Sequence, residues 1–402
     1  MDNSQNIATT QPKEKLWNIG YWKVMIANFS LFFAFYLLTP LLPLYLSENF
    51  HATSDIIGLV LSGYTVTALI SRPFSGFLVD SHPRKKVLLW CFFFFFIFFG
   101  GYLAAGSLVL FALVRTLHGL PFGALAVANS TVAIDVLPSS RRNEGIGYYG
   151  LSNNLAMAFA PTVGLFLYRF THSFDILFII AFVVAGIGFF VDSTLKLPKR
   201  EIIKNKTKLS LDRFFLTRGW LLAVNMTFFG FCYGVLSNYL ALYAKEKMNI
   251  GSGTGIFFTL LSVGLILSRL QGNKGLREGR LTQNACEGVI ISSIGYTLFV
   301  AMPNSVGFYL SALFIGLGNG HMYPAFQNMF ISMAKHNERG TANSTILVAW
   351  DTGIGIGVIV GGFVSHLLDY TAAFWVSAIG QILGATLFIA FGRKFFNKRR
   401  LA

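Results

Sequence analysis

Residues 75–88 read SGFLVDSHPRKKVL and form a short polar stretch between two long apolar ones. The stretch combines Gly76, Asp80 and the three consecutive cations Arg84, Lys85 and Lys86. The whole chain is 54% hydrophobic and 12% charged, whereas a soluble domain carries roughly 25% charged residues. This composition is typical of an integral membrane protein, so we interpret the stretch as a loop between two membrane-spanning helices.

Apolar segments recur along the entire chain of 402 residues. Only helices and closed barrels satisfy the backbone polar groups in lipid, and these segments are too long and too evenly apolar for barrel strands. The sequence therefore predicts an all-α membrane protein with twelve transmembrane helices of about 20 residues each. The predicted helices cover residues 22–46, 56–79, 87–105, 108–134, 146–168, 175–195, 219–243, 254–271, 281–302, 305–333, 341–365 and 371–392.

The cations are distributed asymmetrically around these segments. Of 32 Lys and Arg residues, three lie inside predicted helices and three in the odd-numbered connections, which leaves 26 in the N-terminal tail, the even-numbered connections and the C-terminus. Because Lys and Arg stay on the cytoplasmic side, both termini are predicted to be cytoplasmic, with the protein in the cytoplasmic (inner) membrane. The net charge of +15 then reflects topology, and we expect no nucleic-acid partner.

The longest polar stretch, residues 196–218, carries eight cations and divides the predicted helices six and six. Two short sequences recur on either side of it: ALISRPFSG is echoed by GLILSRLQG, and RRNEGIGYYG by HNERGTANS. We therefore predict two pseudo-symmetric six-helix bundles, residues 1–195 and 219–402, joined by a basic cytoplasmic linker. The basic linker also suits anionic membrane lipid.

The pattern Gly-x-Leu-x-Asp followed by a basic cluster resembles the loop between the second and third helices of the major facilitator superfamily. The resemblance extends over nearly the whole chain. It implies that Asp80 holds the second helix against the N-terminal end of the eleventh, near residue 341, where the helix dipole favours an anion. The implied conformational latch comprises Gly76, Asp80, Arg84 and Arg142. Candidates for ion pairs at the same end are Arg141, Arg142, Glu144, Glu338 and Arg339.

The fourth predicted helix resembles a second family motif, Arg-x-x-Gln-Gly, at Arg115, His118 and Gly119. The resemblance implies that Arg115 takes part in proton transfer. His118 replaces the family glutamine. A histidine can carry a proton near neutral pH, and it can equally serve as a hydrogen-bonding substitute for glutamine.

The fifth predicted helix resembles the family's antiporter motif, Gly-x-x-x-Gly-Pro-x-x-Gly. The matching positions are Ala156, Ala160, Pro161 and Gly164, so alanine replaces two of the glycines. Small residues four apart allow close helix packing, and proline bends a helix. The resemblance favours export by antiport over import.

Asp351 is the acid that lies deepest in a predicted helix. It follows Thr341 by ten residues, which places it about 15 Å into the helix and near the middle of a hydrocarbon core of about 30 Å. A carboxylate at that depth needs a bound proton or a cationic partner. We interpret Asp351 as a protonatable site, with a structural hydrogen-bonding role as the alternative. His321 lies at similar depth in the tenth predicted helix. We interpret it as a residue of proton coupling or substrate binding in a polar network with Asp351, with a neutral hydrogen-bonded histidine as the alternative.

The resemblance also implies that the first, fourth, seventh and tenth helices line a central cavity. Besides Arg115 and His118, the lining is then expected to include Asn28, Tyr36, Asn225, Tyr233, Asn238, Tyr239, Tyr323 and Gln327. This set is rich in aromatic and amide groups, which suits an amphipathic organic solute. Because of Arg115 and the histidines, an anionic solute is an alternative.

Together these features predict a secondary active transporter that exports a small organic solute, a drug or metabolite, by proton antiport through alternating access. Proton- or sodium-coupled uptake of a sugar or carboxylate is the alternative, and a receptor or channel is a further one. The sequence has no nucleotide-binding loop, metal-ligand spacing or paired catalytic carboxylates, so we expect no enzyme activity, cofactor or metal. The family resemblance implies a monomer.

Overall fold

The computed structural model describes residues 15–39, 41–52, 54–197, 214–248 and 254–401. Within these ranges all regular secondary structure is helical. Eight of the helices found there are long and apolar enough to cross a membrane. The chain is thus all-α and has the character of a multi-pass membrane protein, as the composition predicted.

The predicted first helix, residues 22–46, is two helices in the structure. Pro43 lies in the first turn of the second of them, where its missing N–H group costs no helical hydrogen bond. Each of the next five predicted segments falls on one long helix. The helices of this part of the chain are α1 (Ile19–Leu38), α2 (Leu42–Phe50), α3 (Ser54–Ser81), α4 (Arg84–Ala104), α5 (Leu108–Val136), α6 (Arg142–Thr171) and α7 (Phe174–Ser193).

The helices that follow the linker also match the predicted segments. The last segment, residues 371–392, is an α-helix continued by a π-helical turn. The helices are α8 (Trp220–Lys247), α9 (Thr254–Arg277), α10 (Leu281–Ala301), α11 (Ser305–Ser332), α12 (Arg339–Leu367), α13 (Tyr370–Leu387), the π-helix η5 (Phe388–Gly392) and α14 (Arg393–Arg399).

An internal repeat is visible in the short 3₁₀ turns η1 (Ser139–Arg141) and η4 (His336–Glu338). The first leads directly into α6 and the second into α12. Their first residues are 197 positions apart, the same separation as Arg72 and Arg269 in the two echoed sequences. The chain thus repeats a local structure as well as a local sequence.

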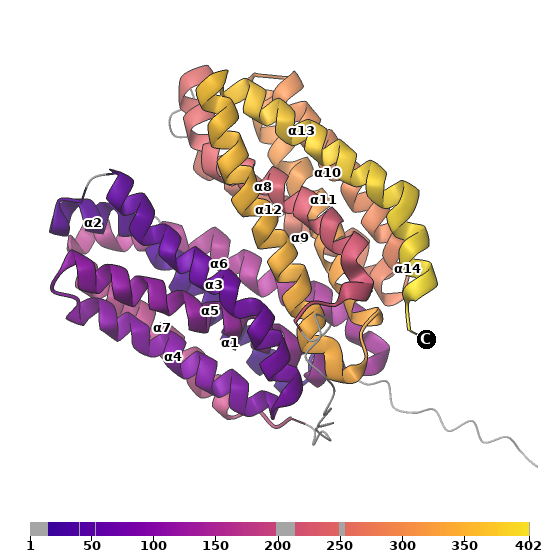
Figure 1. Cartoon of the computed structure of the whole chain (residues 1–402), viewed down its shortest axis with the longest axis horizontal. Coiled ribbons are helices and arrows are strands. Elements are labelled where there is room, and N and C mark those ends of the chain that lie inside the picture. The colour runs from indigo at the N-terminus through magenta and orange to yellow at the C-terminus, as the bar shows by residue number, and fades with distance from the viewer. Residues whose placement is uncertain (1–14, 40, 53, 198–213, 249–253, 402) are drawn as a thin grey trace, which may run out of the picture.

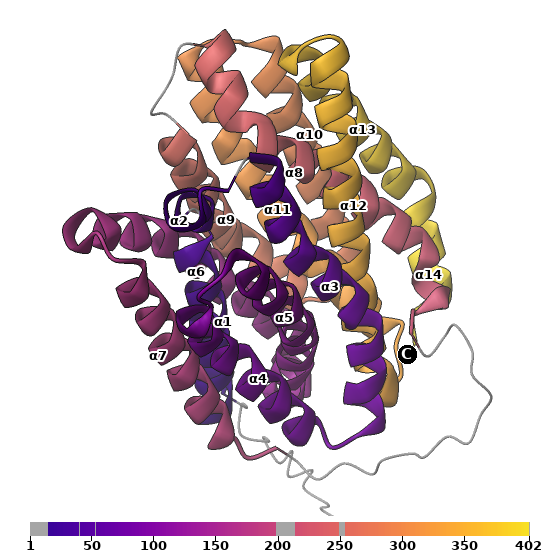
Figure 2. The ribbon, with the colours of Figure 1, turned by 60° about the vertical axis from the view of Figure 1, so that its left-hand side comes forward.

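Figure 1 shows the indigo to magenta helices α1–α7 on one side and the orange to yellow helices from α8 onward on the other. The two groups meet near the end of the molecule that holds α14 and diverge toward α2. Figure 2 shows α3 running beside α12, and these two helices are in contact. α6 and α9 form a second contact between the groups.

Three hydrophobic clusters form the core. One lies within α1–α7 and one within the helices from α8 onward. The third crosses between the groups and joins Tyr21, Ile134 and Ile146 to Met322 and Phe326. The groups are therefore held together by buried apolar contacts at the end where they converge.

Candidate functional site

Asp80 caps the N-terminus of α12 from the opposite group of helices. The backbone N–H groups of Gly340 and Thr341 donate to its two carboxylate oxygens at 3.0 and 2.8 Å, and the Thr341 hydroxyl donates at 3.0 Å. The positive end of the helix dipole stabilises an anion at this position. The structure thus places Asp80 at the helix end that the family resemblance implied.

Gly76 makes the close approach of α3 to α12 possible. A Cβ atom at this position would lie 2.8 Å from the Ser344 Cβ and 3.0 Å from the Gly340 carbonyl oxygen. Both distances are shorter than normal van der Waals contact, so a larger residue would push the helices apart. We call the contact between residues 72–80 and 339–351 the α3–α12 interface.

Arg84 ties three elements together beside Asp80. Its guanidinium donates to both Asp135 carboxylate oxygens at 2.5 and 2.6 Å, to Asp80 at 3.2 Å and to the His336 carbonyl at 3.0 Å. Its side chain is only 3% exposed. Arg142 lies beside this group, where it donates to Ser139 Oγ at 3.3 Å and interacts electrostatically with Asp135.

The other candidate ion-pair residues at this end are also engaged. The closest contacts of these pairs are 2.8 Å from Arg141 to Glu144, 2.9 Å from Arg218 to Glu338 and 3.5 Å from Arg339 to Asp135. Sequence analysis missed Asp135 and Arg218 as partners. Their pairing depends on how neighbouring helices pack, which single-segment reasoning does not reveal.

A second ion pair, between Arg72 and Asp351, lies deeper in the α3–α12 interface. Arg72 Nη1 donates to Asp351 Oδ2 and, at 3.2 Å, to the Leu347 carbonyl. The Ser344 hydroxyl donates to the Arg72 carbonyl at 2.6 Å. Arg72 precedes the end of α3 by nine residues, about 14 Å along the helix. This distance is about half the thickness of a hydrocarbon core of about 30 Å. Asp351, whose side chain is 23% exposed, therefore has the cationic partner that was expected for a carboxylate at this place in the helix.

Two tyrosines from the predicted cavity lie near this pair, and a third interacts with one of them. Tyr36 of α1 and Tyr323 of α11 interact electrostatically with both Arg72 and Asp351, and Tyr36 also interacts with Tyr233. All three tyrosines keep part of their surface exposed.

Trp350 connects two of these tyrosines and precedes Asp351 in the chain. The ring centroids of Tyr233 and Tyr323 lie 5.6 and 5.5 Å from that of Trp350. An ion pair bordered by aromatic rings can bind a solute that has both apolar and charged groups. Trp350 and Arg72 were not among the residues predicted for the site, although Arg72 stood out as a cation inside an apolar segment.

Two predicted cavity amides are buried in helix packing. Asn28 donates to Ser152 Oγ at 2.7 Å and accepts from the Tyr149 hydroxyl at 2.7 Å, so it joins α1 to α6. Asn225 donates to the Gly384 carbonyl at 3.0 Å and joins α8 to α13. Both side chains are completely buried.

The remaining predicted cavity residues occupy three different settings. Asn238 is exposed and donates to the Gly234 carbonyl at 2.9 Å, within its own helix. Tyr239 donates its hydroxyl to the Val358 carbonyl at 2.6 Å. Gln327 donates to Asn343 at 3.3 Å, and Asn343 donates across the two groups to Thr131 at 3.1 Å.

Arg115 and His118 form a buried cluster within α1–α7. Arg115 donates to the Tyr102 hydroxyl at 3.1 Å, and this hydroxyl is 2.7 Å from His118 Nδ1. The Arg115 guanidinium also lies 3.9 Å above the centre of the Tyr64 ring. Tyr64 interacts electrostatically with both Arg115 and Arg72, so it connects this cluster to the α3–α12 interface.

His321 is engaged within the second group of helices. Its Nδ1 is 2.9 Å from Asn284 Oδ1, and Asn284 donates to the His321 carbonyl at 3.2 Å. Within the described residues, the hydrogen-bonding partner of the His321 ring is therefore Asn284 and not Asp351. The residue fits between α9, α10 and α11.

The antiporter-like residues pack α6 against α1. Ala156 and Ala160 are completely buried. A Cβ atom on Gly164 would collide with the Leu37 carbonyl oxygen, so glycine allows the two backbones to touch. Pro161 lies inside α6, between these small residues.

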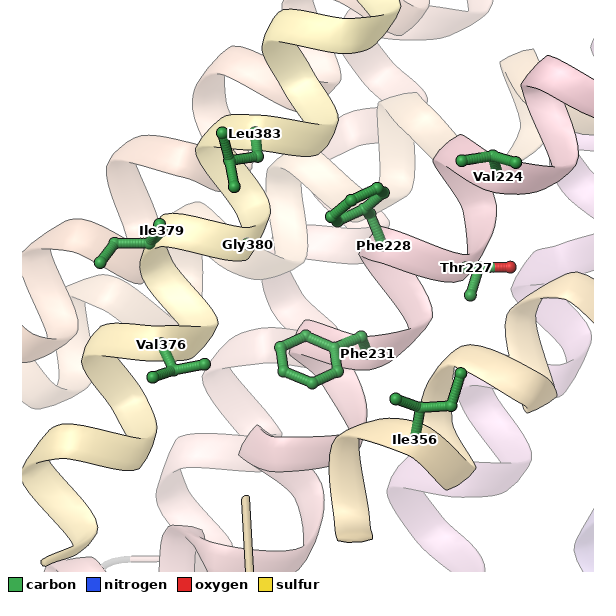
Figure 3. Close-up of a pocket in the computed structure, with 9 residues that line it drawn as sticks. All are labelled: Val224, Thr227, Phe228, Phe231, Ile356, Val376, Ile379, Gly380 and Leu383. Carbon is green, nitrogen blue, oxygen red and sulfur yellow. The ribbon is translucent and has the colours of Figure 1, made fainter. Parts of the chain in front are cut away.

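A separate apolar pocket of about 490 Å³ lies between α8, α12 and α13 (Figure 3). Its one polar side chain, Thr227, donates to the Ala223 and Ala349 carbonyls at 3.1 Å. Ile356, Ile379 and Leu383 are 44%, 52% and 54% exposed, so the pocket opens on the outer surface of the bundle. Its lining suits an acyl chain better than a polar solute. The lining residues are Val224, Thr227, Phe228, Phe231, Ile356, Val376, Ile379, Gly380 and Leu383.

Comparison with known proteins finds relatives that match more than 90% of the chain. The chain is 24% identical over 380 residues to the uncharacterized MFS-type transporter YhhS of Escherichia coli K12, covering 91% of this chain and 92% of that one. It is 22% identical over 392 residues to the staphylopine export protein of Staphylococcus aureus Mu50, covering 93% and 96%.

Solved structures share the fold. The human organic anion transporter MFSD10 matches with a TM-score of 0.79 at 17% identity, over 94% of this chain and all of that one. FucP in its outward conformation matches with a TM-score of 0.77 at 16% identity, over 96% of this chain and all of that one. The family model for the Major Facilitator Superfamily matches residues 24–283 and 286–400. The chain therefore belongs to the Major Facilitator Superfamily and is an integral, multi-pass membrane transporter of that family.

Proposed function

We propose that the protein exports a small organic solute in exchange for protons, and that the α3–α12 interface couples the two movements. The observation that carries the proposal is the ion pair between Arg72 and Asp351, which joins the two groups of helices near mid-depth. Export is also consistent with one of the relatives, the staphylopine export protein.

The proposed topology is twelve transmembrane helices in two six-helix bundles, residues 1–195 and 219–402, with α1 and α2 together forming the first span. Both termini lie in the cytoplasm and the protein resides in the inner membrane as a monomer. The one-sided distribution of 26 of the 32 Lys and Arg residues supports this orientation. It places the end that bears Asp80 on the cytoplasmic side. Most of the linker, residues 198–213, lies outside the described residues.

The proton acts through the charge of Asp351. When Asp351 takes up a proton, Arg72 becomes a buried cation without a partner, which costs about 3–5 kcal/mol. Protonation therefore favours separation of α3 from α12 and opening of the cytoplasmic end. In an exchange the proton must leave before the solute binds, so proton and solute oppose each other's binding by the same factor.

These linkages give an antiport cycle. A proton from outside binds Asp351 while the cytoplasmic end is closed, and the interface opens inward. The proton leaves to the cytoplasm and the solute binds next to Tyr36, Tyr233 and Tyr323. The ion pair then forms again, the cytoplasmic end closes, and the solute leaves on the outside.

The other residues support this cycle. Gly76, Asp80, Arg84 and Arg142 form the latch of the closed cytoplasmic end, where the side chains of Arg84 and Asp80 are only 3% and 9% exposed and their contacts together bias one arrangement. Arg115 and His118 provide a second place for a proton, connected to Arg72 through Tyr64.

Transport in proteoliposomes with an imposed pH gradient tests the proposal. The labelled solutes are those that raise the melting temperature of the purified protein in a screen of drugs, sugars, amino acids and organic acids. Antiport accumulates the solute on the acidic side whichever way the protein inserts, whereas proton-coupled uptake accumulates it on the alkaline side. We expect Asp351→Asn to lose gradient-driven accumulation and the exposed control Asp369→Asn to keep it. Accumulation on the alkaline side contradicts export.

A further inference from the structure

Two buried arginines occupy equivalent places in the internal repeat. Arg72 of α3 and Arg269 of α9 are 197 residues apart and are 6% and 7% exposed. Arg72 donates to the carbonyl of Leu347 on α12. Arg269 Nη2 lies 3.6 Å from the position that a Cβ on Gly150 of α6 would take. Leu347 and Gly150 are also 197 residues apart, so each arginine faces the same position of the opposite helix.

The two arginines differ in their charge partners. Arg72 is neutralised by Asp351, whereas the residue 197 positions before Asp351 is Asn154. Within the described part of the chain, Arg269 forms no ion pair. Its one hydrogen bond there, from Nη1, goes to the Gly320 carbonyl at 3.0 Å. Among the residues that the structure describes, a positive charge is thus buried at the contact between α6 and α9 without an acid to balance it.

The groups that face Arg269 do not supply a negative charge. Tyr21 and Tyr148 interact with it electrostatically, and so does His321. The Tyr21 hydroxyl donates to the Gly145 carbonyl at 2.6 Å. Glu144 is near Tyr21, but its carboxylate pairs with Arg141 at 2.8 Å.

One edge of the Arg269 guanidinium is available for a ligand. Nη1 is used by Gly320, and Nε has no hydrogen-bond partner among the described residues. Nε and Nη2 present two parallel N–H groups, which match the two oxygens of a carboxylate. This edge is covered while α6 and α9 are in contact, and opening of the cytoplasmic end uncovers it.

We propose that the transported solute is an organic anion whose carboxylate binds the Nε and Nη2 groups of Arg269 when the contact between α6 and α9 opens. This inference rests on the proposed transport function and narrows its substrate class. The carboxylate of the solute balances the Arg269 charge, as Asp351 balances Arg72. The aromatic residues around Trp350 contact the apolar part of the solute.

Binding to the purified full-length protein tests this inference without any transport. The probes are benzoate, phenyl phosphate, benzyl alcohol and benzylamine at neutral pH, which share a ring and differ in charge. We expect benzoate to bind more tightly than benzyl alcohol and benzylamine. Tighter binding of phenyl phosphate than of benzoate would overturn the assignment to a carboxylate.

Three variants of α6 and α9 separate the charge of Arg269 from its structural role. Arg269→Gln is expected to weaken benzoate binding roughly 10- to 100-fold. Arg269→Lys keeps the charge but loses the paired donors, so its affinity should be intermediate. Asn154→Asp supplies an internal carboxylate, and we expect it to weaken benzoate binding while raising the melting temperature. The exposed control Arg277→Gln on the same helix should bind like the unmodified protein.

The inference is wrong if benzoate binds no better than benzyl alcohol, or if both Arg269→Gln and Asn154→Asp keep full benzoate affinity. Asn154→Asp keeps the test decisive if Arg269→Gln fails to fold. Loss of proton-driven export would not change these binding results, so the two proposals fail independently.

Discussion

The α3–α12 interface and the contact between α6 and α9 occupy equivalent places in the internal repeat, but the acidic residues of the first have no acidic counterparts in the second. Asp80 and Asp351 both serve the first interface, and the residues 197 positions away are Arg277 and Asn154, respectively. The arginine has been kept in both copies as Arg72 and Arg269. Among the described residues, ion pairs therefore join the two groups of helices at the α3–α12 interface, whereas Arg269 at the contact between α6 and α9 has no ion-pair partner.

This difference assigns separate tasks to the two contacts. A carboxylate that belongs to the protein can be switched by a proton, so the α3–α12 interface can respond to pH. An arginine without an acid can be satisfied by a solute, so the contact between α6 and α9 can respond to substrate. Opening of one end of the molecule involves both contacts, and the two ligands are linked through it.

The largest effect is expected when the arginine of each contact is replaced in turn and the two losses of stability are compared. Arg72→Gln leaves Asp351, whose side chain is 23% exposed, without its cationic partner, and we expect a loss of about 3 kcal/mol in the free energy of unfolding. Arg269→Gln removes an unbalanced charge, so its stability should be unchanged or higher. Denaturant unfolding of the two variants in detergent measures the contrast, and equal losses would refute it.

A double variant tests whether Arg72 and Asp351 stabilise the protein through the same interaction. Because Arg72→Gln and Asp351→Asn remove the same interaction, the pair together should cost much less than the sum of the two single changes. Additive effects would show that the two side chains are not coupled.

An intermediate effect is expected where the helices touch most closely. Gly76→Ala places a Cβ 2.8 Å from the Ser344 Cβ, and we expect the α3–α12 interface to lose about 1–3 kcal/mol. Gly355→Ala on α12 is the matched control, because this glycine is also helical and no atom of another part of the chain lies within 4 Å of its added Cβ. Melting temperatures of both variants test this, and an equal shift for the two would argue against close packing at Gly76.

The smallest effect is expected from an exposed ion pair within one group of helices. Lys247 and Asp369 are 3.0 Å apart and both are about 40% exposed. The Ala372 N–H group and Lys247 lower the pKa of Asp369, so its stabilisation is present above the usual carboxyl pKa and is lost as the pH falls through the lowered value.

Asp369→Asn keeps the cap on α13 and removes only the charge. We expect it to change stability at neutral pH by no more than about 0.5 kcal/mol. Urea unfolding at neutral and acidic pH measures this change. A loss as large as that of Arg72→Gln would show that burial between the two groups is not what makes an ion pair important.

The sequence predicts the helices well because each one depends on a local run of apolar residues. It also locates Asp80, because the motif around it is contiguous. The partner of Asp351 could not be read in this way: Arg72 lies 279 residues earlier, and only helix packing brings the two together.

The predicted cavity shows the same limit. Tyr36 and Tyr323 interact with the ion pair, whereas Asn28 and Asn225 are buried in the packing between helices. Knowing which helix a residue occupies does not give the direction of its side chain. The direction depends on rotation of each helix against its neighbours.

If a proton on Asp351 opens the α3–α12 interface, a distance measured across that interface must depend on pH. Spin labels at the exposed positions His82 and Lys335, with Cys91, Cys232 and Cys286 replaced, report on the separation of the two groups by pulsed electron paramagnetic resonance. We predict a short distance at alkaline pH and a longer one at acidic pH. Asp80→Asn should keep this pH response and Asp351→Asn should abolish it. An unchanged pH response in Asp351→Asn would contradict the account.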